Sequence, residues 1–352
     1  MTPAKPLLVV VGGFLGAGKT TLLLRAAALL ERSGYRTALI TNDQGSALVD
    51  TRLACTATPQ IEEVAGGCFC CRFSDFLEAA DRLRAFEPDI ILAEPVGSCI
   101  DIAATVLLPL AEYHGDRYRL APFTVLVDPQ RARELLAPDA DPQLAYLFTN
   151  QLAEADLVCF SRADTCVDFP ELPSAVAFRL SGTTGEGVAE WLAEVLADGR
   201  LSGARPLADV NYGRYAEAEA TLGWMNWRAT LLLERALSPA QVVGQFLDCL
   251  GEALSRDGIA IAHLKLFDQA PTGHIRASLC RNQGEPMVDG MLDASPALEH
   301  DLVLNLRACG SPVQLQVALR EAARQLPGSP AVIHFECFRP APPQPQYRIE
   351  SH

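Results

Sequence analysis

Residues 13–20, GFLGAGKT, contain every fixed position of a phosphate-binding loop, and an apolar run precedes them. Glycines in such a loop let backbone N–H groups converge on phosphate oxygens, and the N-terminus of the helix that follows adds a favourable dipole. Lys19 would bring a positive charge to the β- and γ-phosphates, and the Thr20 hydroxyl would ligate Mg²⁺. The expected nucleotide contacts come from Gly13, Gly16, Ala17, Gly18, Lys19, Thr20 and Thr21.

Two later segments could complete the phosphate chemistry. Residues 89–93, apolar from Ile90 onward, form an expected strand that leads into Glu94, and Gly97 follows shortly after. A carboxylate at a strand end can hold Mg²⁺, and a glycine amide can contact the γ-phosphate. Asp43 lies where a switch segment would reach the same ion, although Asn, Asp and Gly are also ordinary turn formers. The expected catalytic residues are Lys19, Glu94 and Gly97, and the expected Mg²⁺ ligands are Thr20, Asp43 and Glu94.

The base-binding residues are sought in the loops after later strands. GTPases recognise guanine with an Asn-Lys-x-Asp segment, and residues 161–164 here read Ser-Arg-Ala-Asp. Asp164 would accept hydrogen bonds from the guanine edge, and Arg162 would lay its flat guanidinium along the base. Ser181 begins a second loop that would touch the guanine oxygen. We favour GTP, and ATP remains the alternative because the Asn and Lys positions are changed.

Three cysteines form a dense group at Cys68, Cys70 and Cys71. Thiolates select Zn²⁺, Cu(I) or, with added nitrogen or oxygen ligands, Co²⁺ or Fe²⁺. Three sulfurs leave a position for water, for a carboxylate such as Glu62 or Glu63, or for a partner's ligand. The open site suits metal transfer, and the alternatives are a structural cluster or a redox disulfide.

Length and charge bound the class of protein. The chain has 352 residues, which suggests two domains at roughly 100–200 residues each. Its 43 acidic residues against 29 Lys and Arg give a net charge of −14, which argues against nucleic acid and anionic membranes as partners. The apolar run at residues 7–11 is too short for a signal or membrane segment, so we expect a cytoplasmic protein.

Apolar runs and helical spacing alternate over the first 200 residues, which predicts an α/β domain with a mostly parallel sheet. The expected strands cover residues 7–11, 37–41, 89–93, 123–128, 156–160 and 175–180, and the expected helices include 20–33 and 188–196. The predicted organisation is a nucleotide-binding domain at 1–205, a linker at 206–225, a smaller domain at 226–340 and a Pro-rich tail at 341–352.

The second domain is predicted to be a ferredoxin-like α+β layer with an extra strand. Its expected strands cover residues 227–234, 259–267, 274–281, 301–308 and 331–338. Its expected helices cover 239–257 and 312–325, each headed by a Ser-Pro pair that is typical of a helix N-terminus.

The order of these motifs resembles that of CobW-like GTPases, relatives of the nickel chaperones HypB and UreG. The resemblance lies in residues 12–21, 42–45, 66–71, 94–97 and 161–164 and covers about residues 5–200. It implies a GTPase whose Cys68, Cys70 and Cys71 bind a transition metal, with the nucleotide state gating metal affinity or delivery. The C-terminal segment of the family is only loosely matched here, so the client is not transferable by analogy.

The resulting hypothesis is a slow, Mg²⁺-dependent GTPase that serves as a metallochaperone or metal insertase for a client metalloprotein. Zn²⁺ is the first choice of metal, and Co²⁺ or Fe²⁺ are the others. Two rivals remain: a P-loop ATPase or small-molecule kinase with structural cysteines, and a non-catalytic metal or redox sensor. The sequence leaves open the client, a homodimer and the role of the second domain.

Overall fold

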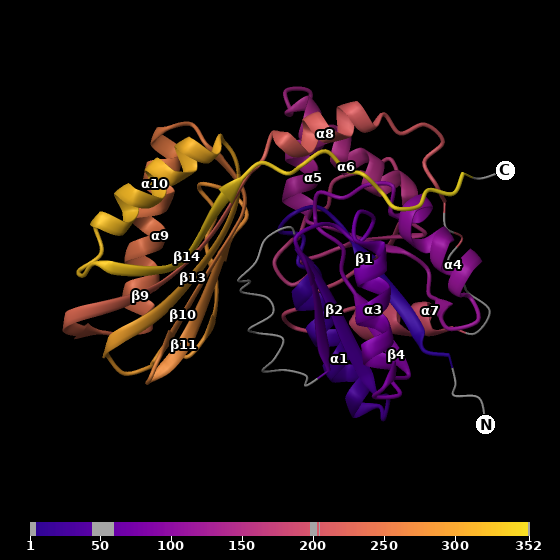
Figure 1. Ribbon diagram of the computed structural model, residues 1–352, viewed down its shortest axis with the longest axis horizontal. Coiled ribbons are helices and arrows are strands. Elements are labelled where there is room, and N and C mark those ends of the chain that lie inside the picture. The colour runs from indigo at the N-terminus through magenta and orange to yellow at the C-terminus, as the bar shows by residue number, and fades with distance from the viewer. Residues whose placement is uncertain (1–4, 44–59, 198–202, 204, 351–352) are drawn as a thin grey trace. The chain divides into compact units, whose positions relative to one another are not determined.

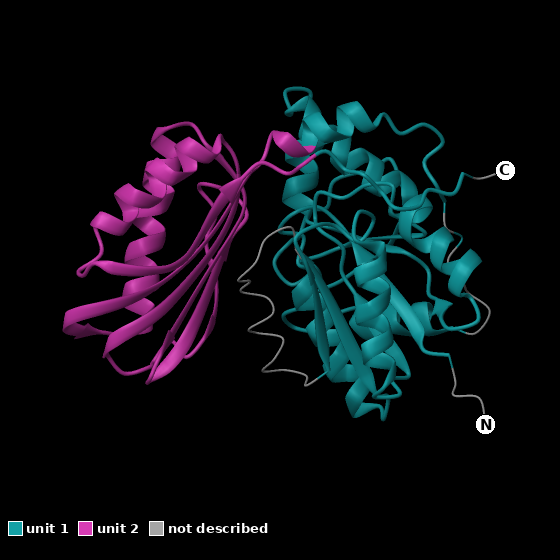
Figure 2. Ribbon diagram, in the orientation of Figure 1, with its two compact units in different colours: residues 1–44, 50–218, 342–352 teal, residues 45–49, 219–341 magenta. Residues whose placement is uncertain are grey.

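The computed structural model describes residues 5–43, 60–197, 203 and 205–350. Most of its helices and many of its strands are labelled in Figure 1, and Figure 2 colours its two compact units. Among the described residues, unit 1 comprises those up to 218 together with 342–350, and unit 2 comprises residues 219–341. Unit 1 is therefore discontinuous in sequence, because the chain returns to it after unit 2.

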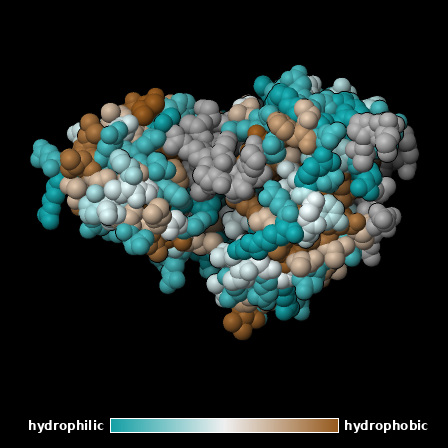
Figure 3. All heavy atoms as spheres, turned by 90° about the horizontal axis from the view of Figure 1, so that it is seen from below, coloured by the Kyte–Doolittle hydropathy of each residue, from teal (hydrophilic) through white to brown (hydrophobic). Residues whose placement is uncertain are grey.

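Hydrophilic side chains cover much of the face shown in Figure 3, and hydrophobic ones occur there in small groups. Within the described part of the chain, no helix combines the length and the apolar character needed to cross a bilayer.

Unit 1 is built on a parallel sheet. In the described residues the strand order is β3-β2-β4-β1-β6-β7-β8, and β5 pairs with β1. The strands are β1 (Leu7–Gly12), β2 (Thr37–Asp43), β3 (Ile61–Ala65), β4 (Ile90–Ala93), β5 (Arg119–Leu120), β6 (Thr124–Val127), β7 (Leu157–Phe160) and β8 (Val176–Arg179). Because parallel strands all end at one edge, the loops after β1, β2 and β4 meet there.

Helices and buried side chains surround this sheet. They are α1 (Lys19–Arg32), α3 (Phe73–Arg84), the π-helix η1 (Ala103–Leu107), α4 (Leu108–His114), α5 (Pro129–Leu136), α6 (Pro142–Glu154), α7 (Val188–Leu196) and α8 (Tyr212–Ala220). Alternate β1 residues, Val9 and Val11, pack with Leu23 of α1 and Trp191 of α7 in one apolar cluster. Burying each such side chain contributes about 1.5–3 kcal/mol, so this cluster fixes α1 on the sheet.

The six strands expected in the first 200 residues are all present, with shifts of one or two residues at their ends. The strands β3 and β5 were not predicted. Helix α8 lies in a stretch that was predicted to be a linker without regular structure.

Unit 2 is an antiparallel sheet with two helices. In the described residues the strand order is β12-β11-β10-β13-β9-β14. The strands are β9 (Gly223–Leu237), β10 (Ala260–Ala270), β11 (Gly273–Leu279), β12 (Met287–Gly290), β13 (Ala297–Cys309) and β14 (Pro330–Phe338). The order β10-β13-β9-β14 with crossover helices is the ferredoxin-like arrangement, as predicted. The hairpin that extends it contains β12, which was not predicted.

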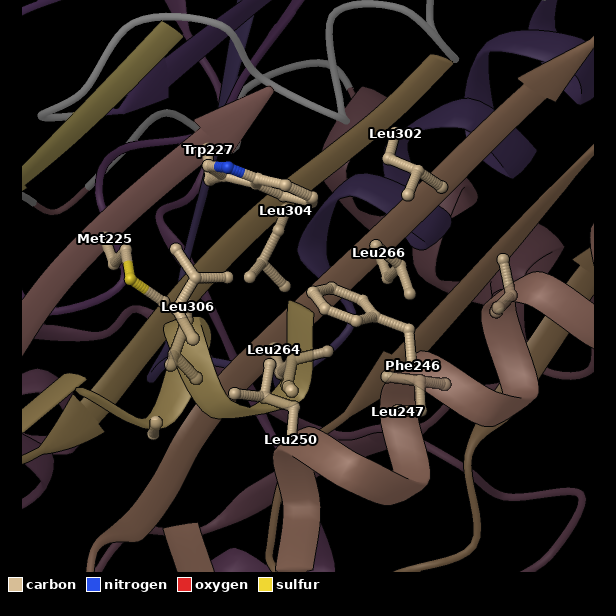
Figure 4. Packing of buried hydrophobic residues seen from close by; sticks show 14 of the residues in the cluster. Met225, Trp227, Phe246, Leu247, Leu250, Leu264, Leu266, Leu302, Leu304 and Leu306 are labelled. Carbon is tan, nitrogen blue, oxygen red and sulfur yellow. The ribbon is translucent and has the colours of Figure 1, made fainter. Parts of the chain in front are cut away.

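The helices of unit 2 are α9 (Pro239–Arg256) and α10 (Pro312–Arg324). Each begins with the predicted Ser-Pro pair, and each has a capping box in which Ser238 or Ser311 is paired with a Gln three residues later. Figure 4 shows their core: Phe246 and Leu250 of α9 point toward leucines of β10 and β13. This packing explains the alternating apolar pattern of those strands.

The described end of the chain packs on unit 1. The Gln346 amide donates to the Cys70 carbonyl at 3.0 Å, and the Ile349 amide donates to the Ala104 carbonyl at 2.9 Å. The Tyr347 ring lies 5.2 Å from the ring of Phe73. We call residues 342–350 the C-terminal strap.

Candidate functional site: a phosphate loop beside a thiol cluster

The phosphate-binding loop closes on itself through Lys19. The Lys19 ammonium donates to the Gly13 carbonyl at 2.7 Å and to the Phe14 carbonyl at 3.4 Å. Gly13 has φ +132°, and a Cβ there would lie 2.2 Å from the carbonyl oxygen of Leu126. Only glycine fits at this position, so β1 can turn sharply into the loop. Lys19 thus lies over the loop, where it would help the loop to bind phosphate.

The loop leads into an uncapped helix N-terminus. Gly18 is the N-cap of α1, and it has a left-handed conformation without a side-chain hydrogen bond to the first turn. The Ala17 amide donates to the Phe14 carbonyl at 3.1 Å, which forms the turn around Gly16. Because the first amides of a helix lack intrahelical partners, Thr20, Thr21 and their neighbours present N–H groups to an anion.

Thr20 and Glu94 meet beside the loop. The Thr20 hydroxyl donates to both Glu94 carboxylate oxygens, at 3.0 and 3.1 Å, and both side chains are buried. A hydroxyl and a carboxylate are hard oxygen donors of the kind Mg²⁺ prefers, so these residues fit that ion. Asp43 ends β2, but its side chain lies outside the described structure, as do Gln44 and Gly45.

Gly97 lies against the same lysine. A Cβ at Gly97 would be 3.0 Å from the Lys19 ammonium and 3.0 Å from the Leu15 amide nitrogen. The loop after β4 thus reaches the phosphate-binding loop at a position where a side chain would be crowded. The Gly97 backbone thus lies beside Lys19, and its contact with a γ-phosphate stays a prediction.

The expected base-binding residues lie on two connected loops. The Ala163 amide donates to the Leu180 carbonyl at 3.0 Å, which joins the loop of Arg162 and Asp164 to the loop of Ser181. Asp164 is exposed, and Ser181 is buried with its hydroxyl accepting from the Thr184 amide. Arg162 has φ +57° and pairs with the buried Asp128 at 2.5 Å. Its guanidinium is therefore engaged by a carboxylate in this structure.

The second of these loops rests on α1. Arg25 of α1 donates to the Gly182 carbonyl at 3.1 Å, and a Cβ at Gly182 would lie 2.9 Å from the Leu22 amide nitrogen. This close approach joins the loop of Ser181 to the helix that begins at the phosphate-binding loop. The expected base and phosphate contacts are thus brought to one region of unit 1.

The thiols of Cys68, Cys70 and Cys71 converge. Their sulfurs all lie within 4.8 Å of one another, and they are the one group of three or more His, Cys, Asp or Glu residues found with that spacing among the described residues. The sulfurs of Cys68 and Cys70 are 2.8 Å apart, and those of Cys70 and Cys71 are 3.8 Å apart. The thiols are free, and Cys68 and Cys70 are buried. The arrangement fits a soft, thiolate-preferring metal ion.

Asn42 fixes the turn that carries these cysteines. Its side-chain amide donates to the carbonyls of Val64 and Gly67, at 2.8 and 2.7 Å, and its oxygen accepts from the Phe69 amide at 3.0 Å. Asn42 lies near the end of β2, at the sheet edge where the loops after β1 and β4 also begin. It therefore joins the thiol cluster to the carboxyl edge of the sheet, a role the sequence analysis did not assign.

The three thiols share their protons unequally. Hydrogen bonds from the Cys70, Cys71 and Cys99 thiols lower the pKa of Cys68 well below that of an ordinary thiol. The hydrogen bond to Cys68 raises the pKa of Cys70 well above its usual range and raises the pKa of Cys71 to about 11. The cluster thus loses a first proton easily and holds the others.

Two parts of the site escaped the sequence analysis. One is Cys99, whose thiol interacts with those of Cys68 and Cys70. The other is the C-terminal strap, where the Gln344 amide donates to the Cys71 sulfur at 3.2 Å. The position of Cys99 shortly after Glu94 was a usable signal, since both follow one strand that ends at the sheet edge. Glu62, a suggested extra ligand, is instead paired with Arg82 at 2.8 Å.

Comparisons with known proteins show what parts of this chain are similar to. Residues 7–180 match the family model described as CobW/HypB/UreG, nucleotide-binding domain. The chain is 47% identical over 68 residues to the zinc chaperone YjiA of Escherichia coli, and this match covers 19% of this chain and 21% of that protein. It is 33% identical over 196 residues to the zinc chaperone CobW of Pseudomonas aeruginosa, which covers 46% of this chain and 50% of that protein. The chain thus spans about half or less of the length of these curated relatives.

Solved structures give lower identities. The crystal structure of Helicobacter pylori HypB in complex with nickel is 16% identical with a TM-score of 0.40, and the match covers 53% of this chain and 83% of that one. The crystal structure of Zn(II)-bound YjiA GTPase from E. coli is 15% identical with a TM-score of 0.32, and the match covers 90% of this chain and 98% of that one.

Proposed function

We propose, from the match of residues 7–180 to the CobW/HypB/UreG nucleotide-binding domain, that this chain is a Mg²⁺-dependent GTPase that carries a transition metal. The metal is bound by Cys68, Cys70 and Cys71 and delivered to a client protein, and the nucleotide state changes how tightly it is held. Zn²⁺ is the preferred cargo, because thiolates favour it and because the curated relatives are named zinc chaperones.

One observation carries the proposal: the thiol cluster and the phosphate-binding loop share the carboxyl edge of one sheet. The strand β4 lies between β1 and β2. β1 leads into the loop of Lys19, β4 leads to Glu94, and Asn42 at the end of β2 holds the turn of the cysteines. Only a few residues separate these loops from the thiols. A γ-phosphate that orders the loops would therefore also affect the thiols.

The chain's own groups have separate tasks in hydrolysis. Lys19 and the first amides of α1 bind and orient the phosphates, and Gly97 contacts the γ-phosphate. Thr20 and Glu94 would hold Mg²⁺, which neutralises charge that develops on the phosphate oxygens. Asp164, Ser181 and Arg162 would surround the base, once Arg162 leaves Asp128. We identify no catalytic glutamine or arginine finger from the sequence. We therefore expect slow basal turnover that a client stimulates.

The decisive experiment is a Zn²⁺ titration with and without a non-hydrolysable GTP analogue. We expect the analogue to change the Zn²⁺ affinity of the wild-type protein by at least about fivefold, the lower end of typical coupling between sites. A variant with Cys68, Cys70 and Cys71 all replaced by Ser should lose this nucleotide-dependent affinity. An unchanged nucleotide effect in that variant would refute the proposed carrier function.

The base preference needs its own measurement. In a competition assay, unlabelled GTP should displace a fluorescent GTP analogue better than ATP does, and Asp164→Ala should reduce the difference. Stronger displacement by ATP would favour the rival interpretation of the domain as an ATPase or kinase.

A further inference from the structure

Cys99 is a buried thiol on the loop between Glu94 and η1. Its side chain is 3% exposed, and its thiol interacts with the thiols of Cys68 and Cys70. Its backbone is fixed on both sides: the amide donates to the Val96 carbonyl at 3.0 Å, and the carbonyl accepts from the Gln151 side chain at 2.9 Å. Neighbouring residues therefore fix the backbone that carries this sulfur.

The Cys-x-Cys-Cys turn alone supplies too few ligands for a closed tetrahedral site. Zn²⁺ in thiolate sites binds four ligands at Zn–S distances of about 2.3 Å, which places the sulfurs about 3.8 Å apart. Glu62 is paired with Arg82, and neither Glu62 nor Glu63 belongs to the group of described ligand atoms within 4.8 Å of one another. Cys99 is outside that group of three as well, but its thiol is a hydrogen-bond partner of Cys68 and Cys70.

We propose that Cys99 is a fourth sulfur ligand of the metal bound at Cys68, Cys70 and Cys71, and that it joins or leaves the site with the nucleotide state. This inference rests on the proposed metal-carrier function and adds the ligand that couples it to the nucleotide. A closed four-sulfur site holds the metal, and withdrawal of Cys99 leaves the three-sulfur site from which a client can take it.

The loop from Glu94 to Cys99 provides the coupling. Glu94 accepts from Thr20 at one end, and Gly97 lies against Lys19 in the middle. Gln151 donates to the carbonyls of both Gly97 and Cys99, at 3.0 and 2.9 Å, so these two residues are held by a single side chain. A shift of Gly97 toward a γ-phosphate would therefore carry Cys99 with it.

The first test counts sulfur ligands by zinc X-ray absorption on the full-length protein. The Zn²⁺-bound protein is measured once with a non-hydrolysable GTP analogue and once with GDP. One of these two wild-type states should show four sulfurs, and Cys99→Ala in the same state should show three sulfurs and one lighter atom. The matched control Cys159→Ala removes another buried thiol, on β7, and should keep the wild-type count. Three sulfurs in both wild-type states would overturn the proposal, even if Cys99→Ala failed to fold.

The second test measures Zn²⁺ affinity in both nucleotide states by competition with a chromophoric chelator. Cys99→Ala should weaken the tighter state by at least about tenfold, since loss of even an outer partner of a ligand costs that much. It should also shrink the ratio between the two states. An unchanged ratio would overturn the coupling role of Cys99.

These results separate the inference from the proposed function. If the Cys68, Cys70 and Cys71 triple variant keeps its nucleotide-dependent Zn²⁺ affinity, the carrier function itself is wrong. If the triple variant loses it while Cys99→Ala behaves like wild type, the carrier function stands and the fourth ligand is wrong.

Discussion

At the scale of single residues, Glu94 joins the phosphate-binding loop to the loop that carries Cys99. Its carboxylate accepts from Thr20, and the residue is 5% exposed, so a charge there is little screened by water. In the proposed mechanism this buried charge is matched by Mg²⁺ when nucleotide binds. Substitution of Thr20 or Glu94 should therefore impair the proposed hydrolysis.

Glu94→Gln should lower kcat for GTP by about 100-fold or more, because the metal's charge stabilisation is worth several kcal/mol. Nucleotide affinity should fall less, since Lys19 and the amides of α1 remain. Phosphate release under saturating GTP and Mg²⁺ measures the effect. Glu87→Gln, at an exposed position, is the control and should behave like wild type. Equal turnover in both variants would remove Glu94 from the mechanism.

The proton sharing among the cysteines predicts a pH dependence of metal binding. The pKa of Cys68 is lowered, whereas the pKa of Cys70 is raised and that of Cys71 is raised to about 11. Near pH 7 the cluster therefore keeps protons that a metal must displace, so Zn²⁺ affinity should rise as the pH increases from 6.5 to 8.5. Chelator competition at these pH values tests it, and a flat profile would contradict the proton assignment.

At the scale of elements, α6 supports the loop that carries Cys99. Gln151 holds the carbonyls of Gly97 and Cys99, and one turn later Glu154 accepts from the Ala103 amide at 3.0 Å at the beginning of η1. Burial raises the pKa of Glu154 to about 8. The helix that supports this loop thus also carries a carboxyl group whose burial favours the protonated form at neutral pH.

This buried carboxyl makes stability depend on pH. An unfolded Glu titrates near 4.3, so from about pH 4.3 to 8 the folded chain binds a proton that the unfolded chain releases. Stability should therefore fall as the pH rises through this window, by on the order of 4–5 kcal/mol. Glu154→Gln keeps an oxygen for the Ala103 amide and cannot ionise, so its unfolding midpoint should fall less between pH 5 and 8.5. Denaturant unfolding measures this. The exposed variant Glu112→Gln should follow the wild type, and identical slopes in all three proteins would refute the assignment.

The strands and helices were largely predictable from local pattern. Apolar runs predicted the main strands of both units, and the Ser-Pro pairs located the starts of α9 and α10. The strand β3 was missed because Glu62 and Glu63 interrupt its apolar pattern, and β12 was missed because all of its side chains are exposed. Pattern finds an element only where burial shapes its composition.

The same distinction holds for the residues of the candidate site. The sequence located the phosphate-binding loop and the three clustered cysteines, because each is a continuous motif. The contact of Cys99 with Cys68 depends on strand order, which places β4 beside β2, and no local pattern encodes that order. The engagement of Arg162 by Asp128 is likewise a contact between residues far apart in sequence.

At the scale of the whole molecule, the C-terminal strap covers the edge of the thiol cluster within unit 1. The Gln346 side chain accepts from the amide and hydroxyl of Ser74, both at 2.9 Å. Arg348 pairs with the buried Asp101 at 2.8 Å, and Tyr212 of α8 donates to the same carboxylate at 2.7 Å. The segments just before and just after unit 2 are therefore fastened to one side chain, two residues from Cys99.

Loosening the strap should expose the thiols. The double variant Gln346→Ala and Arg348→Ala removes the side-chain bonds of the strap, so alkylation of Cys71 should become several-fold faster. Mass spectrometry of timed iodoacetamide reactions gives the rate at each cysteine. Cys166, which lies on another loop and interacts with the Asp168 carbonyl, serves as the internal control. Equal Cys71 rates in the variant and the wild type would show that the strap does not protect the cluster.

The return of the chain to unit 1 has a consequence for biosynthesis. A ribosome releases the polypeptide from its N-terminus, and N-terminal domains generally fold first. Residues 342–350 emerge only after all of unit 2 has been made, so a nascent nucleotide-binding unit has its cysteines before the segment that covers them. In the proposed carrier function, metal loading during translation would therefore take place on an uncovered thiol cluster, whereas loading after translation would take place beneath a docked strap.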